Sequence, residues 1–120
     1  PRWLDGLDLL SVHGLPVAVI PHYDNAEGGT HDTRFCYLGE RRLSMLEPML
    51  PAGHFVLGVD SHTALVLDFV EATATVMGIG SVTIRADGHS EVFPTGTVVP
   101  IGALAEAAER LRAGGQGTPR

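Results

Sequence analysis

The residues with the clearest chemical potential lie between positions 21 and 33, in the stretch PHYDNAEGGTHDT. His22 directly follows the apolar run from Val17 to Ile20, which is typical of a strand buried on both faces of a parallel sheet. Ligands of open α/β sheets gather just past the carboxyl ends of strands, and a histidine there can act as a base near neutral pH. The alternative is a loop histidine that only makes hydrogen bonds.

A catalytic histidine needs a nucleophile to deprotonate. No serine lies in a G-x-S-x-G elbow between a strand and a helix; the serines are Ser11, Ser44, Ser61, Ser81 and Ser90. Cys36 is the only cysteine, and we expect it to be a half-buried residue of a helix with a structural role. The chain taken alone therefore has a candidate base and no convincing nucleophile.

The same loop holds nitrogen and oxygen groups that could ligate a metal. They are His22, Asp24, His31 and Asp32, with His54 and His62 as further donors. Their spacing matches neither H-E-x-x-H nor C-x-x-C, the arrangements that zinc sites favour. A polar, hydrogen-bonded loop is the favoured interpretation, and we expect no metal and no cofactor.

Arg34 stands at the end of this loop, where an arginine can hold a carboxylate through two parallel hydrogen bonds. A cation at a helix N-terminus is unfavourable by roughly 0.3–1 kcal/mol, which favours a bound anion or an acidic neighbour beside Arg34 over a solvated position. Arg41 and Arg42 need no ligand on these grounds, because one of them could pair with Glu40 or Glu47.

Apolar spacing predicts a helix over 34–50, capped by Asp32 or Thr33. From His54 the chain becomes rich in strands, with the runs HFVLGVD, TALVLDFV, TATVMGIG and SVTIRA. Their short spacing predicts antiparallel neighbours, with turns at Asp60–Ser61 and around Gly78 and Gly80. A second helix is expected over 104–112, followed by a frayed tail.

Composition narrows the class of protein. The 120 residues are 44% hydrophobic and 18% charged, which excludes a disordered chain. The single cysteine excludes an intrachain disulfide scaffold. The net charge is −6 without a basic stripe, so nucleic acid is disfavoured, and no apolar run reaches the length of a membrane span. The free cysteine and the absence of a signal peptide favour a cytoplasmic location, while the start at Pro1 suggests a fragment or a processed product.

Three blocks of the sequence, taken together, resemble the aspartyl dipeptidase and cyanophycinase family of serine peptidases. They are IPHYDNAEGGTHDTR followed by GERRL, then LGVDSHTALVLD, then ATVMGIGSVTI. The resemblance runs from Leu4 to Leu104 and implies the class I glutamine amidotransferase-like α/β fold. We therefore expect residues 1–113 to form the C-terminal part of such a domain, with a partial flavodoxin-like sheet, an antiparallel strand-rich portion and a terminal helix. Residues 114–120 would be a flexible tail.

The resemblance also implies roles for single residues. His22 matches the family's general base. Arg34 matches the arginine that contacts the acidic side chain of the substrate in aspartyl dipeptidases, and Asn25 and His31 of the same loop are expected to bind substrate as well. The nucleophilic serine and its acidic partner are expected in an N-terminal half, upstream of Pro1.

The expected function is therefore that of the C-terminal portion of a serine-type hydrolase, inactive without its nucleophile half. It would act on peptide or isopeptide bonds next to acidic residues, with a small acidic peptide and the missing half as partners; a homodimer stays open. One alternative is an amidotransferase-like domain with a cysteine nucleophile, whose H-x-E unit is partly matched by His22 and Asp24. The other is a non-catalytic domain of the same fold.

Overall fold

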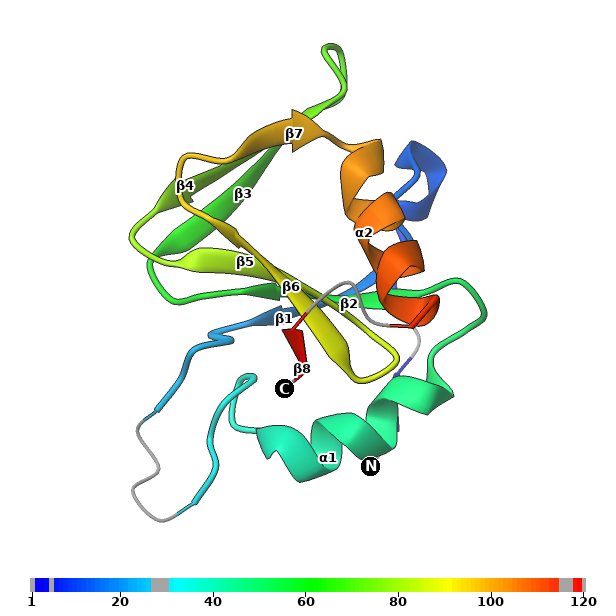
Figure 1. Cartoon of the computed structure of the whole chain (residues 1–120), viewed down its shortest axis with the longest axis vertical. Coiled ribbons are helices and arrows are strands. Elements are labelled where there is room, and N and C mark those ends of the chain that lie inside the picture. The colour runs from blue at the N-terminus through cyan, green and yellow to red at the C-terminus, as the bar shows by residue number, and fades with distance from the viewer. Residues whose placement is uncertain (1, 5, 27–30, 115–117, 120) are drawn as a thin grey trace.

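The computed structural model describes residues 2–4, 6–26, 31–114 and 118–119. They form a mixed α/β domain with two sheets and two helices (Figure 1). The larger sheet has the strand order β1 (Val17–Pro21), β2 (Phe55–Val59), β5 (Ser81–Ala86), β6 (His89–Pro94) and β8 (Thr118–Pro119). The smaller sheet has the order β3 (Thr63–Asp68), β4 (Thr73–Gly78) and β7 (Val98–Pro100). The helices are α1 (Gly39–Leu46) and α2 (Gly102–Arg112), with single 3₁₀ turns at Ser11–His13 and Glu47–Met49.

The alternation of side chains along β2 explains how the layers stack. Phe55 and Leu57 point into the larger core, where they meet the smaller sheet and the apolar face of α2 around Leu104. Val56 points to the other face and packs with Leu43 of α1. Since successive strand residues face opposite sides of a sheet, β2 is buried on both faces, with α1 on one side and α2 with the smaller sheet on the other (Figure 1).

The expected strand at 17–20 is present as β1, which pairs in parallel with β2. The prediction that it is buried on both faces was wrong, because β1 lies at the edge of the sheet and Val19 is 50% exposed. A continuous apolar run does not by itself separate a central strand from an edge strand.

All four strand runs after His54 are confirmed, and β2 and β5 are antiparallel, as are β3 and β4. Consecutive strands are not always neighbours, however: β2 pairs with β5, while β3 belongs to the other sheet. Two further strands were not predicted: β6, which pairs with β5 through the turn at Asp87–Gly88, and the three-residue β7. The β1–β2 pair is the one parallel pairing among the described strands.

The helix expected over 34–50 is much shorter, because α1 begins only at Gly39. Phe35, Cys36 and Tyr37 have φ angles of 61°, 55° and 69°, a left-handed turn that no α-helix contains. The N–H groups of Phe35 and Cys36 donate to the carbonyls of Tyr23 and His22. These tertiary hydrogen bonds take the place of helical ones. Cys36 is half-buried as expected, but in this turn and not in a helix.

The second helix is confirmed and starts two residues earlier than expected, at Gly102. With 11 residues it is the longer of the two, and within the part of the chain that the structure describes no helix is long and apolar enough to cross a bilayer. Four positions of the expected tail, 115–117 and 120, lie outside the described residues, while Thr118–Pro119 pairs with β6.

Candidate functional site

His22 lies immediately beyond the carboxyl end of β1, with its side chain exposed. Its φ angle is 48°, a left-handed conformation that costs a non-glycine residue energy and often marks functional positions. Because β1 and β2 are parallel, their carboxyl ends meet at one edge of the sheet. The residues that follow β2, Asp60 to His62, therefore come next to His22.

The closest partner of the His22 ring is Ser61. The Nδ1 atom of His22 lies 3.1 Å from the Oγ atom of Ser61, and the backbone N–H of Ser61 donates to the Asp24 carboxylate at 2.8 Å. A partner on one ring nitrogen fixes the orientation of an imidazole. Because a hydroxyl can donate or accept, the contact with Ser61 is compatible with either tautomer of the His22 ring. The His22 side chain is exposed, and within the described residues its Nε2 atom has no hydrogen-bond partner.

Sequence reasoning missed Ser61, because Asp60–Ser61 was interpreted as turn chemistry alone. Asp60 does have that role: its carboxylate accepts the backbone N–H of Ser81 at 2.9 Å. Partial burial raises the pKa of Asp60, and the hydrogen bond from Ser81 opposes that shift. The signal that could have located Ser61 is the parallel pairing of β1 with β2, which places the residue after one strand beside the residue after the other.

Asn25 lies at the base of the same loop and is 8% exposed. Its Nδ2 atom donates to the carbonyl of Thr33 at 3.0 Å, and its backbone N–H donates to the carbonyl of His22. Asn25 thus ties the two ends of the loop together and holds the backbone of His22. The residues between these ends, 27–30, lie outside the described part of the chain.

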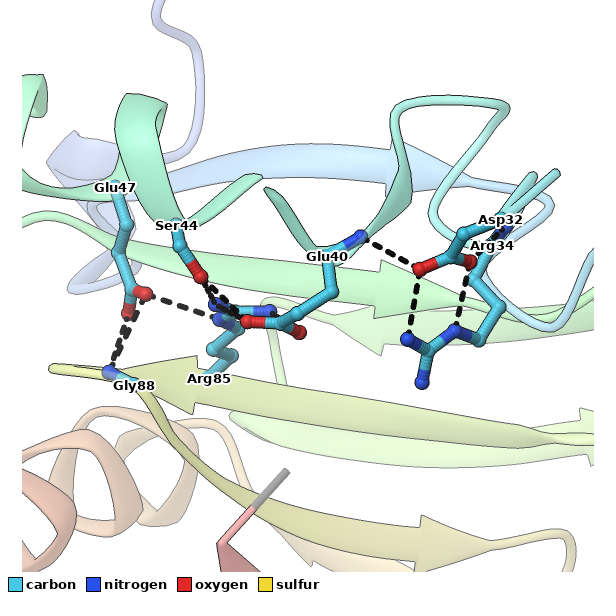
Figure 2. A network of polar contacts seen from close by, with 7 residues as sticks. All are labelled: Asp32, Arg34, Glu40, Ser44, Glu47, Arg85 and Gly88. Carbon is cyan, nitrogen blue, oxygen red and sulfur yellow. Dashed lines mark hydrogen bonds and ion pairs between the residues drawn. The ribbon is translucent and has the colours of Figure 1, made fainter. Parts of the chain in front are cut away.

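Arg34 has the acidic neighbour that the sequence analysis favoured. Its Nε and Nη2 atoms donate to the two oxygens of Asp32 at 2.9 and 2.8 Å. Asp32 also accepts the backbone N–H of Glu40 at 2.9 Å (Figure 2), so it satisfies a first-turn N–H of α1 from outside the helix. The expectation that Asp32 or Thr33 is itself the N-cap residue was wrong, because α1 begins at Gly39 and its N-cap position is Leu38. The hydrogen bonds from Arg34, followed by that from Glu40, lower the pKa of Asp32 far below its usual range.

Arg34 and His22 lie at the same end of the sheet. The chain that follows Arg34 returns alongside the end of β1, where Phe35 donates to the carbonyl of Tyr23 at 3.0 Å and Cys36 donates to that of His22 at 3.1 Å. The Asp32 carboxylate accepts hydrogen bonds from Nε and Nη2 of the Arg34 guanidinium. The Nη1 group of Arg34 has no hydrogen-bond partner among the described residues. Arg34 can therefore still donate to a second carboxylate while it is paired.

His31 is exposed and lines a cavity of about 560 Å³ between the segment 31–33 and the first turns of α1. The wall of the cavity includes Arg41, Arg42 and Asp32, the residue that pairs with Arg34. The four expected site residues thus fall into two groups. His22 and Asn25 form the strand-end group, and Arg34 and His31 lie further along the returning chain.

A buried arginine fixes the helix on which this cavity is built. Arg85 of β5 is fully buried and donates to Glu47 at 3.0 Å and to both oxygens of Glu40 at 3.0 and 2.9 Å (Figure 2). Ser44 lies 3.2 Å from the same guanidinium. The carboxylate of Glu47 also accepts the backbone N–H of Gly88. These bonds clamp α1 onto the sheet, and the sequence analysis did not anticipate them.

Among the described residues, no group of three or more histidine, cysteine, aspartate or glutamate side chains is arranged to hold an ion. His54 precedes β2 and so lies at the opposite end of the parallel pair from His22, with its Nε2 atom 3.8 Å from Asp8. Asp24 is engaged by the backbone of Ser61.

No protein-family model matches the chain, and neither a curated protein nor a solved structure matches it.

Proposed function

We propose that the chain carries the base-bearing portion of a serine-type hydrolase, built on a class I glutamine amidotransferase-like sheet, that cleaves peptide or isopeptide bonds next to acidic residues. The observation that carries the proposal is the placement of His22. Its ring is exposed at the carboxyl end of a parallel strand, and its Nδ1 atom is held by Ser61. A general base needs this combination of an oriented ring and an open second nitrogen.

In the proposed reaction, Nε2 of His22 removes the proton from a serine hydroxyl supplied by an upstream half. The resulting alkoxide attacks the amide carbonyl, and the protonated imidazole then gives its proton to the leaving amine. Ser61 takes the place that a carboxylate has in most triads. A neutral hydroxyl stabilises an imidazolium less than a carboxylate does, so Ser61 positions the ring more than it stabilises its charge.

Arg34 is the candidate for recognition of the acidic residue. Its Nη1 group remains available while Asp32 holds the other side of the guanidinium. Asp32 neutralises much of that charge, so Arg34 contributes orientation more than attraction. An amidotransferase with a His–carboxylate pair receives less support, because the Asp24 carboxylate accepts the N–H of Ser61.

The same contact favours a second arrangement, in which Ser61 itself is the nucleophile. Its Oγ atom is within hydrogen-bonding distance of a histidine nitrogen, as a Ser–His pair requires. The chain would then hydrolyse esters or peptides without an upstream half. A fluorophosphonate probe separates the two cases, because it labels an activated serine and mass spectrometry locates the adduct.

The test is turnover of an aspartyl dipeptide by the complete protein. His22→Asn is the informative variant, because asparagine tolerates a left-handed backbone and alanine there would add strain. We expect kcat to fall by at least about a thousandfold, as in other serine hydrolases that lose their base. His62→Asn is the matched control, since His62 also has a positive φ of 55° and follows Ser61 directly.

The proposal is overturned if His22→Asn turns over the dipeptide as fast as the control variant does. Ser61→Ala then assigns the role of the hydroxyl. A positioning residue lowers kcat by a modest factor and leaves the upstream adduct intact, whereas loss of the fluorophosphonate adduct from the 120-residue chain would identify Ser61 as the nucleophile.

A further inference from the structure

The cavity beside the start of α1 has the size of a small-ligand site. Its volume of about 560 Å³ lies within the range of roughly 300–1,000 Å³ that such sites occupy. His31 and Thr33 line one side, and residues of the first two turns of α1, Arg41 and Arg42 among them, line the other.

The acidic side chains around this cavity have hydrogen-bond partners, whereas two of its arginines have none among the described residues. Asp32 is occupied by Arg34 and by the N–H of Glu40, and Glu40 is occupied by the buried Arg85 (Figure 2). Arg41 and Arg42 are exposed and make neither an ion pair nor a hydrogen bond within the described residues. The acidic groups of the wall are therefore neutralised, while two guanidinium groups are not.

We propose that this cavity binds the carboxylate side chain of an acidic peptide, with Arg41 and Arg42 as its ligands and His31 as a further donor. Guanidinium groups match a carboxylate through paired hydrogen bonds. Leu38 and Met45 also line the cavity and offer an apolar surface to the methylene groups of such a side chain. This apolar part of the wall favours a side-chain carboxylate over inorganic phosphate, which has no methylene groups to place against it.

The position of the cavity relates it to the histidine site. Tyr37, which lines the cavity, follows Cys36, and Cys36 donates to the carbonyl of His22. A peptide seated at Arg41 and Arg42 would thus lie along the chain that returns to the end of β1. Asp32 offsets much of the charge of Arg34, so Arg41 and Arg42 would supply the attraction for the acidic residue while Arg34 orients it. This link to peptide hydrolysis rests on the proposed function; the binding itself does not.

The experiment is an NMR titration of the 120-residue chain with N-acetyl-Asp-Asp-amide, compared with N-acetyl-Asn-Asn-amide and with inorganic phosphate. We expect the aspartyl peptide to shift the amide signals of residues 31–33 and of the start of α1, and to bind about tenfold more tightly than the asparaginyl peptide. Arg41→Gln and Arg42→Gln should each weaken it by a similar factor. Arg110→Gln is the matched control, because it removes the same charge from the exposed face of α2.

Equal affinity for the two peptides, unchanged binding in both arginine variants, or tighter binding of phosphate than of the aspartyl peptide would each overturn the proposal. Since both arginines are exposed, unchanged spectra of the free variants verify that they fold. The proposed hydrolysis can fail independently of this binding. If His22→Asn still binds the peptide and turns over the substrate at an undiminished rate, His22 is not the general base, and the proposed peptide site at Arg41 and Arg42 still stands.

Discussion

The ring of Tyr23 fills the space directly over Gly58. A Cβ atom at position 58 would lie 2.4 Å from the Cγ and Cδ1 atoms of that ring, closer than real side chains approach. Tyr23 follows His22 directly, and its backbone N–H donates to the carbonyl of Val59 at 3.1 Å. The absence of a side chain on β2 thus sets the position of the ring that anchors the candidate base.

Gly58→Ala should therefore destabilise the protein and disturb the histidine site. Overpacking of a core costs about 1–3 kcal/mol, to be measured as the change in the free energy of unfolding in urea. Gly102→Ala is the control, since no atom lies within 4 Å of a Cβ there. Equal stability of the two variants would show that the Tyr23 ring moves aside without cost.

Arg85→Met should be among the most destabilising changes in the chain. It removes the partner of Glu47, whose side chain is only 10% exposed, and of Glu40. Breaking a buried ion pair from one side costs about 3–5 kcal/mol, because the other charge stays buried and uncompensated. Arg110→Gln breaks an exposed pair with Glu91 and should cost no more than about 1 kcal/mol. A similar loss in both variants, measured by chemical denaturation, would contradict the clamp.

Tyr23 should make the protein less stable at high pH. Burial raises the pKa of its hydroxyl to about 12, and the positive charge of Arg85 only partly opposes this. Between pH 10 and 12 the unfolded chain ionises at this tyrosine and the folded chain does not, so folding stability falls as pH rises through that window, by about 2–3 kcal/mol in total.

Tyr23→Phe is the variant that checks this expectation. The Tyr23 hydroxyl is buried near the Arg85 guanidinium but makes no hydrogen bond of normal geometry, so its removal should cost little at neutral pH and should flatten the loss above pH 10. Urea denaturation at pH 8, 10 and 11 measures both effects, and Tyr37→Phe, at an exposed tyrosine, is the control. A loss above pH 10 that is as steep in Tyr23→Phe as in the unaltered chain would assign the effect to other groups.

Asp32→Asn should loosen the start of α1 at neutral pH and remove part of the sensitivity to acid. The pKa of Asp32 is lowered in the folded state, so its stabilisation is present above the unfolded pKa of about 3.9 and is lost as pH falls below it. Because the side chain is solvent-accessible, the loss should be about 1 kcal/mol or less, as for helix caps. Amide hydrogen exchange at Glu40 and Arg41 measures this loss of stability, with Glu106→Gln on the exposed face of α2 as the control. Unchanged exchange at these amides would contradict the capping role.

The strands of the second half could be predicted because β-branched runs separated by glycine, aspartate and serine carry the signal locally. The start of α1 could not be predicted from the sequence. Residues 35–37 adopt a left-handed turn in place of a helix, because Phe35 and Cys36 donate hydrogen bonds to the carbonyls of Tyr23 and His22, which are distant in sequence. Such tertiary contacts override local propensity.

The residues of the candidate site also fall into those that the sequence could predict and those that it could not. His22 could be proposed from its place after an apolar strand, and the acidic neighbour of Arg34 from the cost of a cation at a helix start. Ser61 could not be found, since its contact depends on which strand pairs with β1. Nor could the burial of Arg85 be predicted, because nothing in SVTIRA shows that its partners lie on a helix about forty residues earlier.

The separation between His22 and Ser61, 39 positions along the chain, bears on the order in which the molecule folds. The β5–β6 hairpin closes through a two-residue turn, whereas β1 must find β2 across a long stretch, at a higher loop-closure entropy and a slower rate. We expect refolding chains to form their hairpins early and to bring His22 to Ser61 last. Reactivity would then appear only after most of the β-sheet signal has returned.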